Sequence, residues 1–546
     1  MRIAIAQFNP HIGNFEGNLE KMRLAIAEAK AANATILCFG ELAVCGYPPR
    51  DFLEFDDFIR LCDHSIEQLA KESTADFAIV VGAPTRNPKP EGKDLYNSAY
   101  FLANGAVQQI VHKTLLPTYD IFDEYRYFEP NTEFEVVHFK GKRIALTICE
   151  DIWNVGNDNP LYKTCPLDEL QAQKPDFVLN LSASPFSYAH AAERVHVLRA
   201  NVARYGLPMF YVNHSGGSTE VIFDGGSLVV SPNGCVHDEL PYFAEAVRCY
   251  DLQAVADGGV ERQQPKQKMA LIHDALVCGI QNYFGKLGFK SAILGLSGGI
   301  DSAVVAVLAA RALGSENVRV LLMPSEYSSE HSIGDAIKLA ETLGIKYDIV
   351  PIKDAYTTIL DTLTPFFDGK PFNVAEENLQ ARIRMTYLMA MSNKFGNVLL
   401  NTSNKSEAAV GYGTLYGDMA GGMGVIGDIY KTEVYELANY INRDAEIIPY
   451  NSITKPPSAE LRPDQKDSDS LPDYGILDTI LYQYIEQRQG PNEIIAQGFD
   501  AALVRRILRL VNINEFKRFQ APPILRVSSK AFGVGRRMPI EGKYLG

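Results

Sequence analysis

Residues 297–302 read Ser297-Gly298-Gly299-Ile300-Asp301-Ser302, and this hexamer decides how the second half of the chain folds. The apolar run before it, 292–296, predicts a buried strand, and the apolar run after it, 303–313, predicts a helix. Strand, glycine turn and helix start together bring several backbone N–H groups and a positive dipole end to one point. We therefore expect this point to bind an anion, most often a phosphate.

Two other motifs lie in the same region, and the sequence argues against both. Residues 295–299 satisfy the Gly-x-Ser-x-Gly pattern of a hydrolase nucleophile, but that interpretation leaves Asp301 and Ser302 without a role. Residues 422–427 satisfy Gly-x-Gly-x-x-Gly, but no strand pattern precedes them, so we expect a mobile glycine-rich loop. The Gly-Lys-Ser/Thr ending of a P-loop occurs nowhere in the chain.

The composition excludes several classes of protein. The 546 residues carry a net charge of −14 without a basic block, which argues against nucleic acid as a partner. The eight cysteines show neither C-x-x-C pairs nor zinc spacing, so we expect reduced thiols. The chain begins directly with a strand pattern and has no apolar run of membrane-spanning length, which predicts a cytoplasmic protein without a membrane partner.

The first 250 residues alternate short apolar strands with helical stretches. Strands are predicted over 3–8, 35–39, 77–81, 109–112, 143–148, 176–181 and 209–213, and a helix over 18–32. Three reactive side chains follow strands in this half: Glu41, Lys113 and Cys149. A thiolate that attacks an amide needs a base and a cationic neighbour, so the three suit amide hydrolysis.

The order of these three residues resembles the Glu-Lys-Cys triad of the nitrilase superfamily, and the resemblance covers the whole of this half. It implies a nitrilase-like αββα sandwich in which Cys149 is the nucleophile. Glu41 would be the general base, and Lys113 would stabilise the oxyanion of each tetrahedral intermediate.

The same resemblance implies a glutamine-binding site formed by Tyr119, Ser184 and His190. Relatives often carry a basic residue six positions after this serine, where the present chain has His190. A histidine is a weaker anchor for a carboxylate at neutral pH. The alternative to glutamine binding is that Tyr119 and Ser184 only form ordinary hydrogen bonds within their loops.

Polarity rises sharply between residues 251 and 268, and no periodic pattern survives there. We predict a linker at 251–268 between a first domain, 1–250, and a second, 269–546. Beyond the hexamer, strands alternate with helices over 318–323, 329–343, 346–352, 378–394 and 397–400. This alternation predicts a doubly wound parallel sheet, Rossmann-like, with ligands at the carboxyl ends of its strands.

The hexamer resembles the pyrophosphate loop of the N-type ATP pyrophosphatases, in which a substrate group attacks the α-phosphate of ATP. Later segments resemble the bacterial NAD synthetases in the same order: 376–382, 402–407, 427–433, 455–461 and 516–523. With the nitrilase-like half in front, the full length is similar to the glutamine-dependent NAD synthetases. The resemblance implies ATP-driven amidation of deamido-NAD with ammonia from glutamine, carried by a sheltered route whose course no residue reveals.

The resemblance also implies binding residues by matched position. For ATP they are Gly295, Leu296, Ser297, Gly298, Gly299, Ile300, Asp301, Ser302, Thr402, Lys431 and Ser458. For deamido-NAD they are Asn378, Glu407 and Lys517, and for Mg²⁺ they are Asp301 and Glu407. Without the resemblance, the preferred interpretation is that Asn378 lies on a polar face of a helix and that Lys517 is a surface charge.

Two features of the family bear on what else the chain does. Its members self-associate through the synthetase half, so we expect a homo-oligomer. Single-domain relatives carry a lysine and an aspartate in the segment that matches 415–422, where this chain has Leu415 and Gly422. No dinucleotide contact is therefore predicted for that loop.

Two other functions stay open. Another glutamine amidotransferase on the same core, such as a synthetase of GMP or asparagine, would take a different substrate, although such enzymes normally carry other glutaminase types. A nucleotide-binding scaffold with decayed sites would lack Cys149, Lys113 or Asp301, and all three are present.

Overall fold

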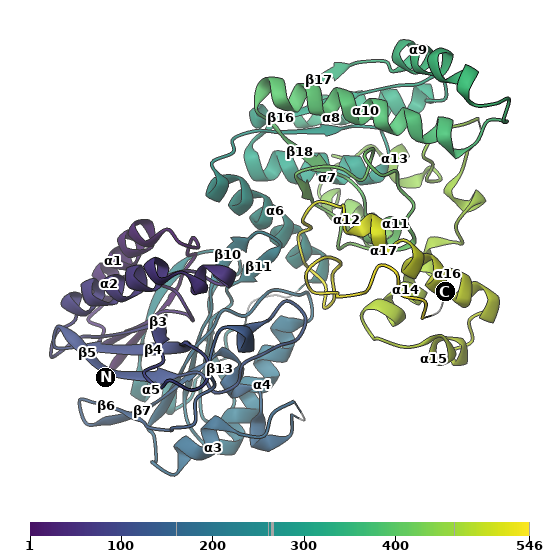
Figure 1. The fold of residues 1–546 in the computed structure, drawn as a ribbon. Coiled ribbons are helices and arrows are strands. Elements are labelled where there is room, and N and C mark those ends of the chain that lie inside the picture. Colours follow the sequence, from purple (N-terminus) through teal and green to yellow (C-terminus); the bar gives the residue numbers. More distant parts are fainter. Residues whose placement is uncertain (160, 260, 264–266, 464, 545–546) are drawn as a thin grey trace. The chain divides into compact units, whose positions relative to one another are not determined.

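The computed structural model describes residues 1–159, 161–259, 261–263, 267–463 and 465–544 (Figure 1). The chain divides into two compact units, Met1–Lys266 and Gln267–Gly546. Part of the segment predicted as a linker, residues 260 and 264–266, lies outside the described residues. At the start of that segment, the short helix α5 (Leu252–Ala256) packs into the core of the first unit through Leu252 and Val255.

The first unit holds two six-stranded sheets. One sheet has the order β14 (Ala246–Asp251), β1 (Arg2–Gln7), β2 (Ile36–Cys38), β3 (Ala78–Arg86), β4 (Leu95–Ala103) and β5 (Ala106–His112). The other has the order β13 (Val236–Glu239), β12 (Leu228–Val230), β9 (Met209–Val212), β8 (Phe177–Leu181), β7 (Lys142–Ile148) and β6 (Val137–Phe139). A separate hairpin pairs β10 (Ser215–Ser218) with β11 (Val221–Asp224).

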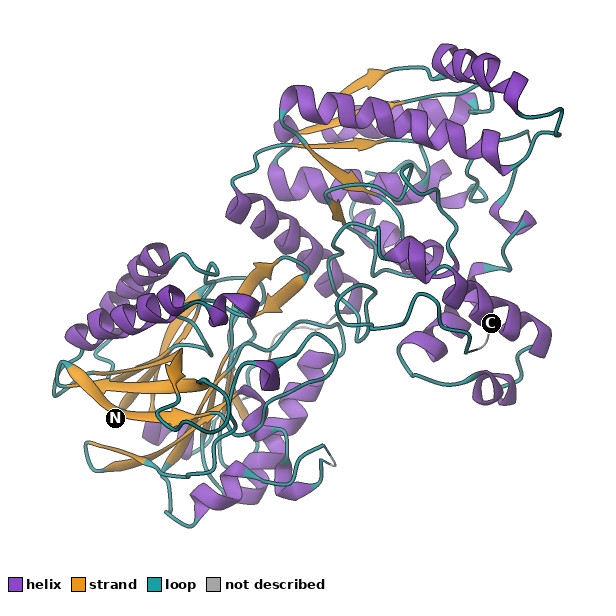
Figure 2. Cartoon of the chain, viewed as in Figure 1, coloured by secondary structure: helices purple, strands orange, loops and turns teal. Residues whose placement is uncertain are grey.

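Alternate residues of each strand face different layers of this unit. On β7, Ile144 and Ile148 join a core shared with the other sheet, whereas Ala145 joins the core under α3 (Pro166–Gln171) and α4 (His190–Tyr205). The outer face of the first sheet packs on α1 (Phe15–Ala31) and α2 (Asp56–Glu72). Figure 2 shows the resulting strand layers between helices, so the predicted αββα sandwich is confirmed. Burial on both faces explains why these strands are apolar at consecutive positions.

The second unit is built on one parallel five-stranded sheet (Figure 2). Its order is β17 (Lys346–Ile349), β16 (Val318–Leu322), β15 (Ala292–Gly295), β18 (Val398–Asn401) and β19 (Met423–Gly424). The predicted doubly wound parallel sheet is confirmed. Connections leave β15 and β18 toward opposite edges of the sheet, so a crevice opens beyond their carboxyl ends, where ligands of such folds bind.

Helices cover both faces of this sheet. Helices α9 (Lys353–Leu363) and α10 (Val374–Phe395) pack on one face, in a core that includes Ile293 and Leu321. The helices on the other face are α6 (Lys268–Leu287), α7 (Ile300–Leu313), α8 (Glu330–Leu343) and α12 (Lys431–Ile441). The alanine- and valine-rich side chains of α7 are almost all buried, because the helix is packed between the sheet and other helices.

Helices that follow β18 form a smaller core of their own. They are α11 (Lys405–Val410), α14 (Tyr474–Ile485), α15 (Pro491–Ala496) and α16 (Ala501–Ile513), and α17 (Glu515–Arg518) contacts α16. Helix α13 (Tyr450–Thr454) instead contacts α7 and α8. Leu477, Ile507 and Leu508 lie at the centre of this core. None of the described helices is long and apolar enough to cross a membrane.

The prediction of a mobile loop at 422–427 is wrong. Met423–Gly424 forms β19, which pairs with β18, and the following Val425 and Ile426 are fully buried. Chain 523–525 runs close by: the N–H of Gly424 donates to the Pro523 carbonyl at 2.8 Å. The glycines serve this close approach, since a Cβ at Gly427 would stand 2.5 Å from Ile524 Cγ2.

Candidate active sites

Cys149 directly follows β7 and opens a short 3₁₀ turn, η3 (Cys149–Ile152). Its φ of 45° lies in the left-handed region, which non-glycine residues rarely occupy and which is common at functional sites. The side chain is only 5% exposed. The fold therefore presents this thiol at a sharp turn on the carboxyl end of a buried strand.

Glu41 and Lys113 are brought together just after strands β2 and β5. Lys113 Nζ donates to Glu41 Oε1 at 2.6 Å, and both side chains are almost completely buried. Asn97 Nδ2 also donates to Oε1 at 2.7 Å, and the N–H of Ala183 donates to Oε2 at 3.1 Å. The carboxylate of Glu41 is thus fixed in position and shielded from bulk water.

A second carboxylate that the sequence did not predict belongs to the same cluster. Glu124 is 5% exposed, and Lys113 Nζ donates to its Oε1 at 2.9 Å. Burial works against the charge of Lys113, but Glu124 and Glu41 outweigh it and hold the pKa of this lysine well above its usual value. Burial also raises the pKa of Glu124 to about 7, although Lys113 opposes the shift.

The same charges act on the nucleophile. Burial, and next the charge of Glu41, raise the pKa of the Cys149 thiol well above its usual value, while Lys113 opposes them. The resting group is therefore a thiol rather than a thiolate. It reacts as a nucleophile only if a base takes its proton during attack, and Glu41 is placed for that task.

Asp151 connects the strand ends that carry Lys113 and Cys149. Its Oδ1 accepts the N–H groups of Thr114 at 3.0 Å and Leu115 at 2.8 Å, and its Oδ2 accepts the N–H of Ile148 at 3.0 Å. This buried carboxylate, which no prediction included, fixes the spacing between the two reactive residues.

The three residues predicted to bind glutamine contact different partners. Ser184 Oγ and His190 Nε2 lie 2.9 Å apart, so the structure brings these two together. Tyr119 instead donates its hydroxyl to Glu150 Oε1 at 3.0 Å, and Tyr162 donates to the same oxygen at 2.8 Å. Glu150 is buried, and it directly follows the nucleophile in the sequence. That position could have marked it as a candidate site residue.

In the second unit, a cavity of about 510 Å³ opens at the carboxyl ends of β15, β16 and β18. The hexamer forms its floor and leads into the N-terminus of α7. Gly298 has a φ of 78°, and a Cβ there would lie 2.1 Å from the carbonyl oxygen of Ser332. Only glycine fits this turn. The N–H of Ser297 donates to Ser302 Oγ at 3.3 Å and that of Gly299 to Ser297 Oγ at 3.2 Å, and the turn leads into the N-terminus of α7, where the first N–H groups have no partner within the helix.

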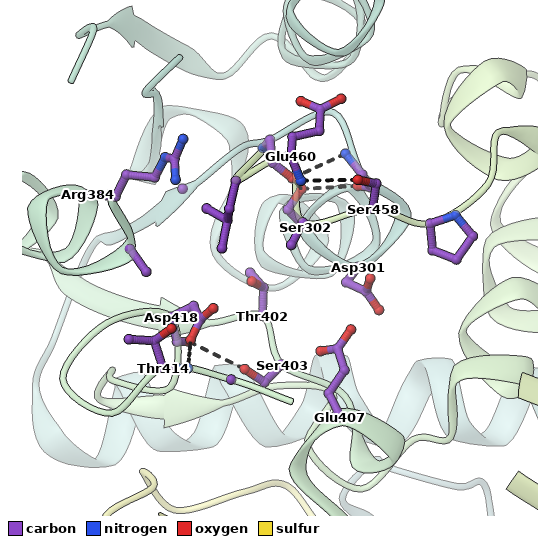
Figure 3. A pocket seen from close by; sticks show the side chains of 18 of the residues that line it. Asp301, Ser302, Arg384, Thr402, Ser403, Glu407, Thr414, Asp418, Ser458 and Glu460 are labelled. Atoms are coloured by element: carbon purple, nitrogen blue, oxygen red, sulfur yellow. Dashed lines mark hydrogen bonds between the residues drawn. The ribbon is translucent and has the colours of Figure 1, made fainter. Parts of the chain in front are cut away.

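Every residue predicted for the nucleotide and dinucleotide, except Gly298, lines this one cavity. They are Gly295, Leu296, Ser297, Gly299, Ile300, Asp301, Ser302, Asn378, Thr402, Glu407, Lys431, Ser458 and Lys517. Figure 3 shows part of this wall, with Arg384, Asp418 and Glu460, which the sequence analysis missed, around the same space. Burial lowers the pKa of Arg384 to about 10.

Asp301 and Glu407 form an acidic pair in the cavity, and Figure 3 shows their carboxylates pointing toward one another. Lys431 Nζ forms an ion pair with Asp301 and lies 3.7 Å from Glu407 Oε1, while Asn404 Nδ2 donates to Asp301 Oδ1 at 2.9 Å. Burial, and next the charge of Asp301, raise the pKa of Glu407 to about 8. Two such carboxylates without enough positive charge favour a divalent cation between them.

Asn378 and Lys517 both hold the loop at residues 411–414. Thr414 Oγ1 donates to Asn378 Oδ1 at 2.7 Å, and Lys517 Nζ donates to the carbonyls of Gly411 at 2.8 Å and Gly413 at 2.9 Å. Burial lowers the pKa of Lys517, although Asp418 opposes the shift. These two side chains thus shape the cavity wall through this loop as well as lining it.

Comparison with known proteins extends these findings. The family model "Carbon-nitrogen hydrolase" matches residues 2–257, and "NAD synthase" matches residues 272–521. A glutamine-dependent NAD(+) synthetase of Synechocystis sp. is 46% identical, with 98% of each chain covered. That of Acinetobacter baylyi is 41% identical, covering 99% of this chain and 98% of the relative. The chain belongs to the family of glutamine-dependent NAD(+) synthetases.

A solved structure of this synthetase family agrees along the full length. The glutamine-dependent NAD+ synthetase of Acinetobacter baumannii, determined in complex with adenosine diphosphate, has a TM-score of 0.78 and 38% identity and covers 99% of this chain and 98% of its own. That of Cytophaga hutchinsonii, at 21% identity, has a TM-score of 0.85 and supports the fold alone. The resemblance to a nitrilase-like domain joined to an NAD synthetase is confirmed, and the chain is an enzyme of the ligase class.

Proposed function

We propose that this synthetase converts deamido-NAD, ATP, L-glutamine and water into NAD⁺, AMP, diphosphate and glutamate. The observation that carries the proposal is the presence in one chain of two separate sets of groups. The first unit holds a buried Cys149 with Glu41 and Lys113, and the second holds a glycine turn at the floor of an acidic cavity. The first set suits amide cleavage, and the second suits transfer at a nucleotide phosphate.

In the first unit, Cys149 attacks the γ-amide of glutamine while Glu41 accepts the thiol proton. Lys113, held by Glu41 and Glu124, stabilises the oxyanion, and Glu41 then protonates the departing ammonia. Glu41 next activates the water that cleaves the thioester. The raised pKa of Cys149 supports this order, because the proton is still on sulfur when the substrate arrives.

Glutamine is held beside the cysteine by groups already described. Ser184 binds its α-carboxylate, His190 supports Ser184 through the hydrogen bond between them, and Tyr119 contributes through its hydrogen bond to Glu150. In the part of the chain that the structure describes, no lysine or arginine pairs with the buried Glu150, so this carboxylate is available to the α-ammonium group of the substrate.

In the second unit, the nicotinate carboxylate of deamido-NAD attacks the α-phosphate of ATP. The N–H groups of residues 297–302, with Thr402 and Ser458, bind the phosphates, and the dipole of α7 favours the charge of the departing diphosphate. Asn378, Glu407 and Lys517 contact the dinucleotide. Ammonia then displaces AMP from the adenylate, which is needed because a free carboxylate is a poor electrophile at neutral pH.

Asp301 and Glu407 are the residues that would hold Mg²⁺, and the raised pKa of Glu407 fits a site that lacks positive charge. Bound Mg²⁺ would neutralise charge on the phosphates as the bond to the α-phosphate breaks. Two protein carboxylates suffice, because Mg²⁺ keeps waters and takes substrate phosphates as further ligands. Lys431 forms an ion pair with Asp301 and orients it.

Purified protein supplied with ATP, Mg²⁺, deamido-NAD and glutamine provides the test. We expect NAD⁺, AMP and glutamate in equal amounts, and the absence of NAD⁺ would overturn the proposal. Xanthylate and aspartate in place of deamido-NAD test the alternative of another amidotransferase. Release of diphosphate with either of them, but not with deamido-NAD, would favour that alternative.

We further propose that the protein acts in the cytoplasm as a homo-oligomer associated through its second unit. All eight cysteines are free, which suits a reducing compartment. Three large apolar side chains are exposed close together in the sequence of the second unit: Phe366, Phe372 and Val374. Light scattering after gel filtration tests whether copies of the chain associate.

A further inference from the structure

Ser184, His190 and Glu193 form a continuous chain of hydrogen bonds in the first unit. His190 Nε2 lies 2.9 Å from Ser184 Oγ, and His190 Nδ1 lies 3.0 Å from Glu193 Oε2. Ser184 is 3% exposed and follows β8, whereas the side chains of His190 and Glu193, both on α4, are 24% and 59% exposed. The chain thus runs from solvent to a buried hydroxyl.

The imidazole ring is held in one orientation. The indole of Trp153 stacks on it with ring centroids 5.0 Å apart and an interplanar angle of 5°. A half-turn flip of the ring would keep this stacking but put carbon atoms in place of Nδ1 and Nε2, so both hydrogen bonds would be lost. Nδ1 therefore always faces the carboxylate, and Nε2 always faces the serine hydroxyl.

The direction of the bond between His190 and Ser184 depends on the charge of the ring. The Glu193 carboxylate accepts only, so Nδ1 must carry a proton in either charge state. In the neutral ring, Nε2 is then an acceptor, and Ser184 must donate its hydroxyl proton to it. In the imidazolium, Nε2 donates to Ser184 Oγ, and the hydroxyl proton is free to point elsewhere.

We infer that Glu193 and protonated His190 together make Ser184 a hydrogen-bond donor to the α-carboxylate of glutamine, so that glutamine binding weakens as the ring loses its charge. This inference rests on the proposed glutaminase function of the same site. Glu193 and His190 are positioning residues, because Ser184 is the group that touches the substrate.

One other carboxylate near the ring interacts with it. Glu150, in the turn η3, interacts electrostatically with His190. It also accepts hydrogen bonds from the hydroxyls of Tyr119 and Tyr162. Burial raises the pKa of Glu150, with the tyrosine hydroxyls, Lys113 and His190 opposing the shift. Two carboxylates, Glu150 and Glu193, thus interact with the ring, and imidazoles change charge between about pH 5 and 8.

The experiment measures kcat and KM for glutamine hydrolysis between about pH 6 and 9 in the full-length enzyme, in His190→Arg and in Glu193→Gln. In the native enzyme the KM should rise about 10-fold through the imidazole titration range, because a hydrogen bond to a charged group is lost, with little change in kcat. The arginine variant keeps a permanent cation that can stack on Trp153, so its KM should stay flat. Glu193→Gln removes the carboxylate beside Nδ1, so its rise in KM should come at lower pH than in the native enzyme.

A substrate without the carboxylate separates this inference from the proposed function. Hydrolysis of 4-aminobutyramide, which has the γ-amide and ammonium group of glutamine only, should show the same KM profile in all three proteins. A native KM for glutamine that does not change with pH, or profiles that Glu193→Gln and His190→Arg leave unaltered, would overturn the inference while glutaminase activity persists. A protein that releases no glutamate from glutamine at any pH would overturn the proposed function itself.

Discussion

Cys149 is held as a thiol in surroundings that oppose its ionisation, with Glu41 and Lys113 as its charged neighbours. A protonated thiol is a poor nucleophile. It reacts only when an amide is bound beside it and a base accepts its proton. The fold thus makes the reactivity of this residue depend on occupancy of its own site.

Replacement of Cys149 should therefore affect only one nitrogen donor. Cys149→Ala should lose glutamine-driven synthesis by at least about 1,000-fold, because the nucleophile is gone, and keep synthesis with ammonium chloride. Rates of NAD⁺ formation with each donor measure this. Cys235→Ala, at a half-exposed cysteine of the same unit, is the matched control and should keep both rates. Equal loss with both donors in Cys149→Ala would indicate a single shared site.

Glu407 provides a pH-dependent signature of the second site. Because its pKa is raised to about 8, it holds a proton near neutral pH until a cation binds. Binding of Mg²⁺–ATP should release that proton, and the affinity should increase as the pH rises toward about 8 and then level off. Calorimetry in buffers of different ionisation enthalpy measures the release.

The controls are two glutamine substitutions in the second unit. Glu407→Gln should bind Mg²⁺–ATP without releasing a proton, whereas Glu436→Gln, on the exposed side of α12, should behave like the native protein. Proton release that persists in Glu407→Gln would assign the titrating group to another residue.

At the scale of elements, the close approach of chain 523–525 to β19 and the residues after it requires glycine at position 427. The Gly427 Cα hydrogen faces Ile524, and an added methyl would stand 2.5 Å from Ile524 Cγ2. Gly427→Ala should lower the free energy of unfolding by about 1–3 kcal/mol, as overpacking does. Denaturant unfolding measures the loss, and in an Ile524→Ala background, which removes the clashing carbon, the loss should be smaller.

Gly334→Ala on α8 is the matched control for this substitution, since nothing lies within 4 Å of a Cβ there. It should be neutral or stabilise the protein by about 0.5 kcal/mol through lower entropy of the unfolded chain. If Gly427→Ala cost the same with Ile524 present or absent, the close approach would not be the reason for the glycine.

Many elements could be predicted because their pattern is local. Strands β15, β16, β17 and β18 and helices α7, α8 and α10 of the second unit were predicted within a few residues, since their patterns are bounded by glycine or polar residues. Strand β4 was not, because Asn97 and Ser98 interrupt its apolar run, and the structure buries both completely. Asn97 is polar because it holds Glu41, a contact made only in the folded chain. Helices α11–α17 likewise had no predicted counterpart.

At the scale of the whole molecule, the sequence predicted residues that belong to a recognisable motif, but it did not predict the residues that contact them in the fold. Glu124 lies in a short 3₁₀ turn far from any strand end, and only its contact with Lys113 makes it part of the cluster. Arg384 occupies one polar position of a long helix, yet it lines the cavity of the second unit (Figure 3). Such roles arise from tertiary contacts, which a single sequence does not contain.

The central claim is that one chain takes nitrogen from an amide in its first unit and places it on a carboxylate activated by ATP in its second. Glutamine labelled with ¹⁵N at the amide, supplied with ATP, Mg²⁺ and deamido-NAD, tests this through the mass of the product. The account predicts one ¹⁵N in each NAD⁺, with one AMP formed per NAD⁺. Unlabelled NAD⁺, or labelled NAD⁺ without AMP, would contradict it.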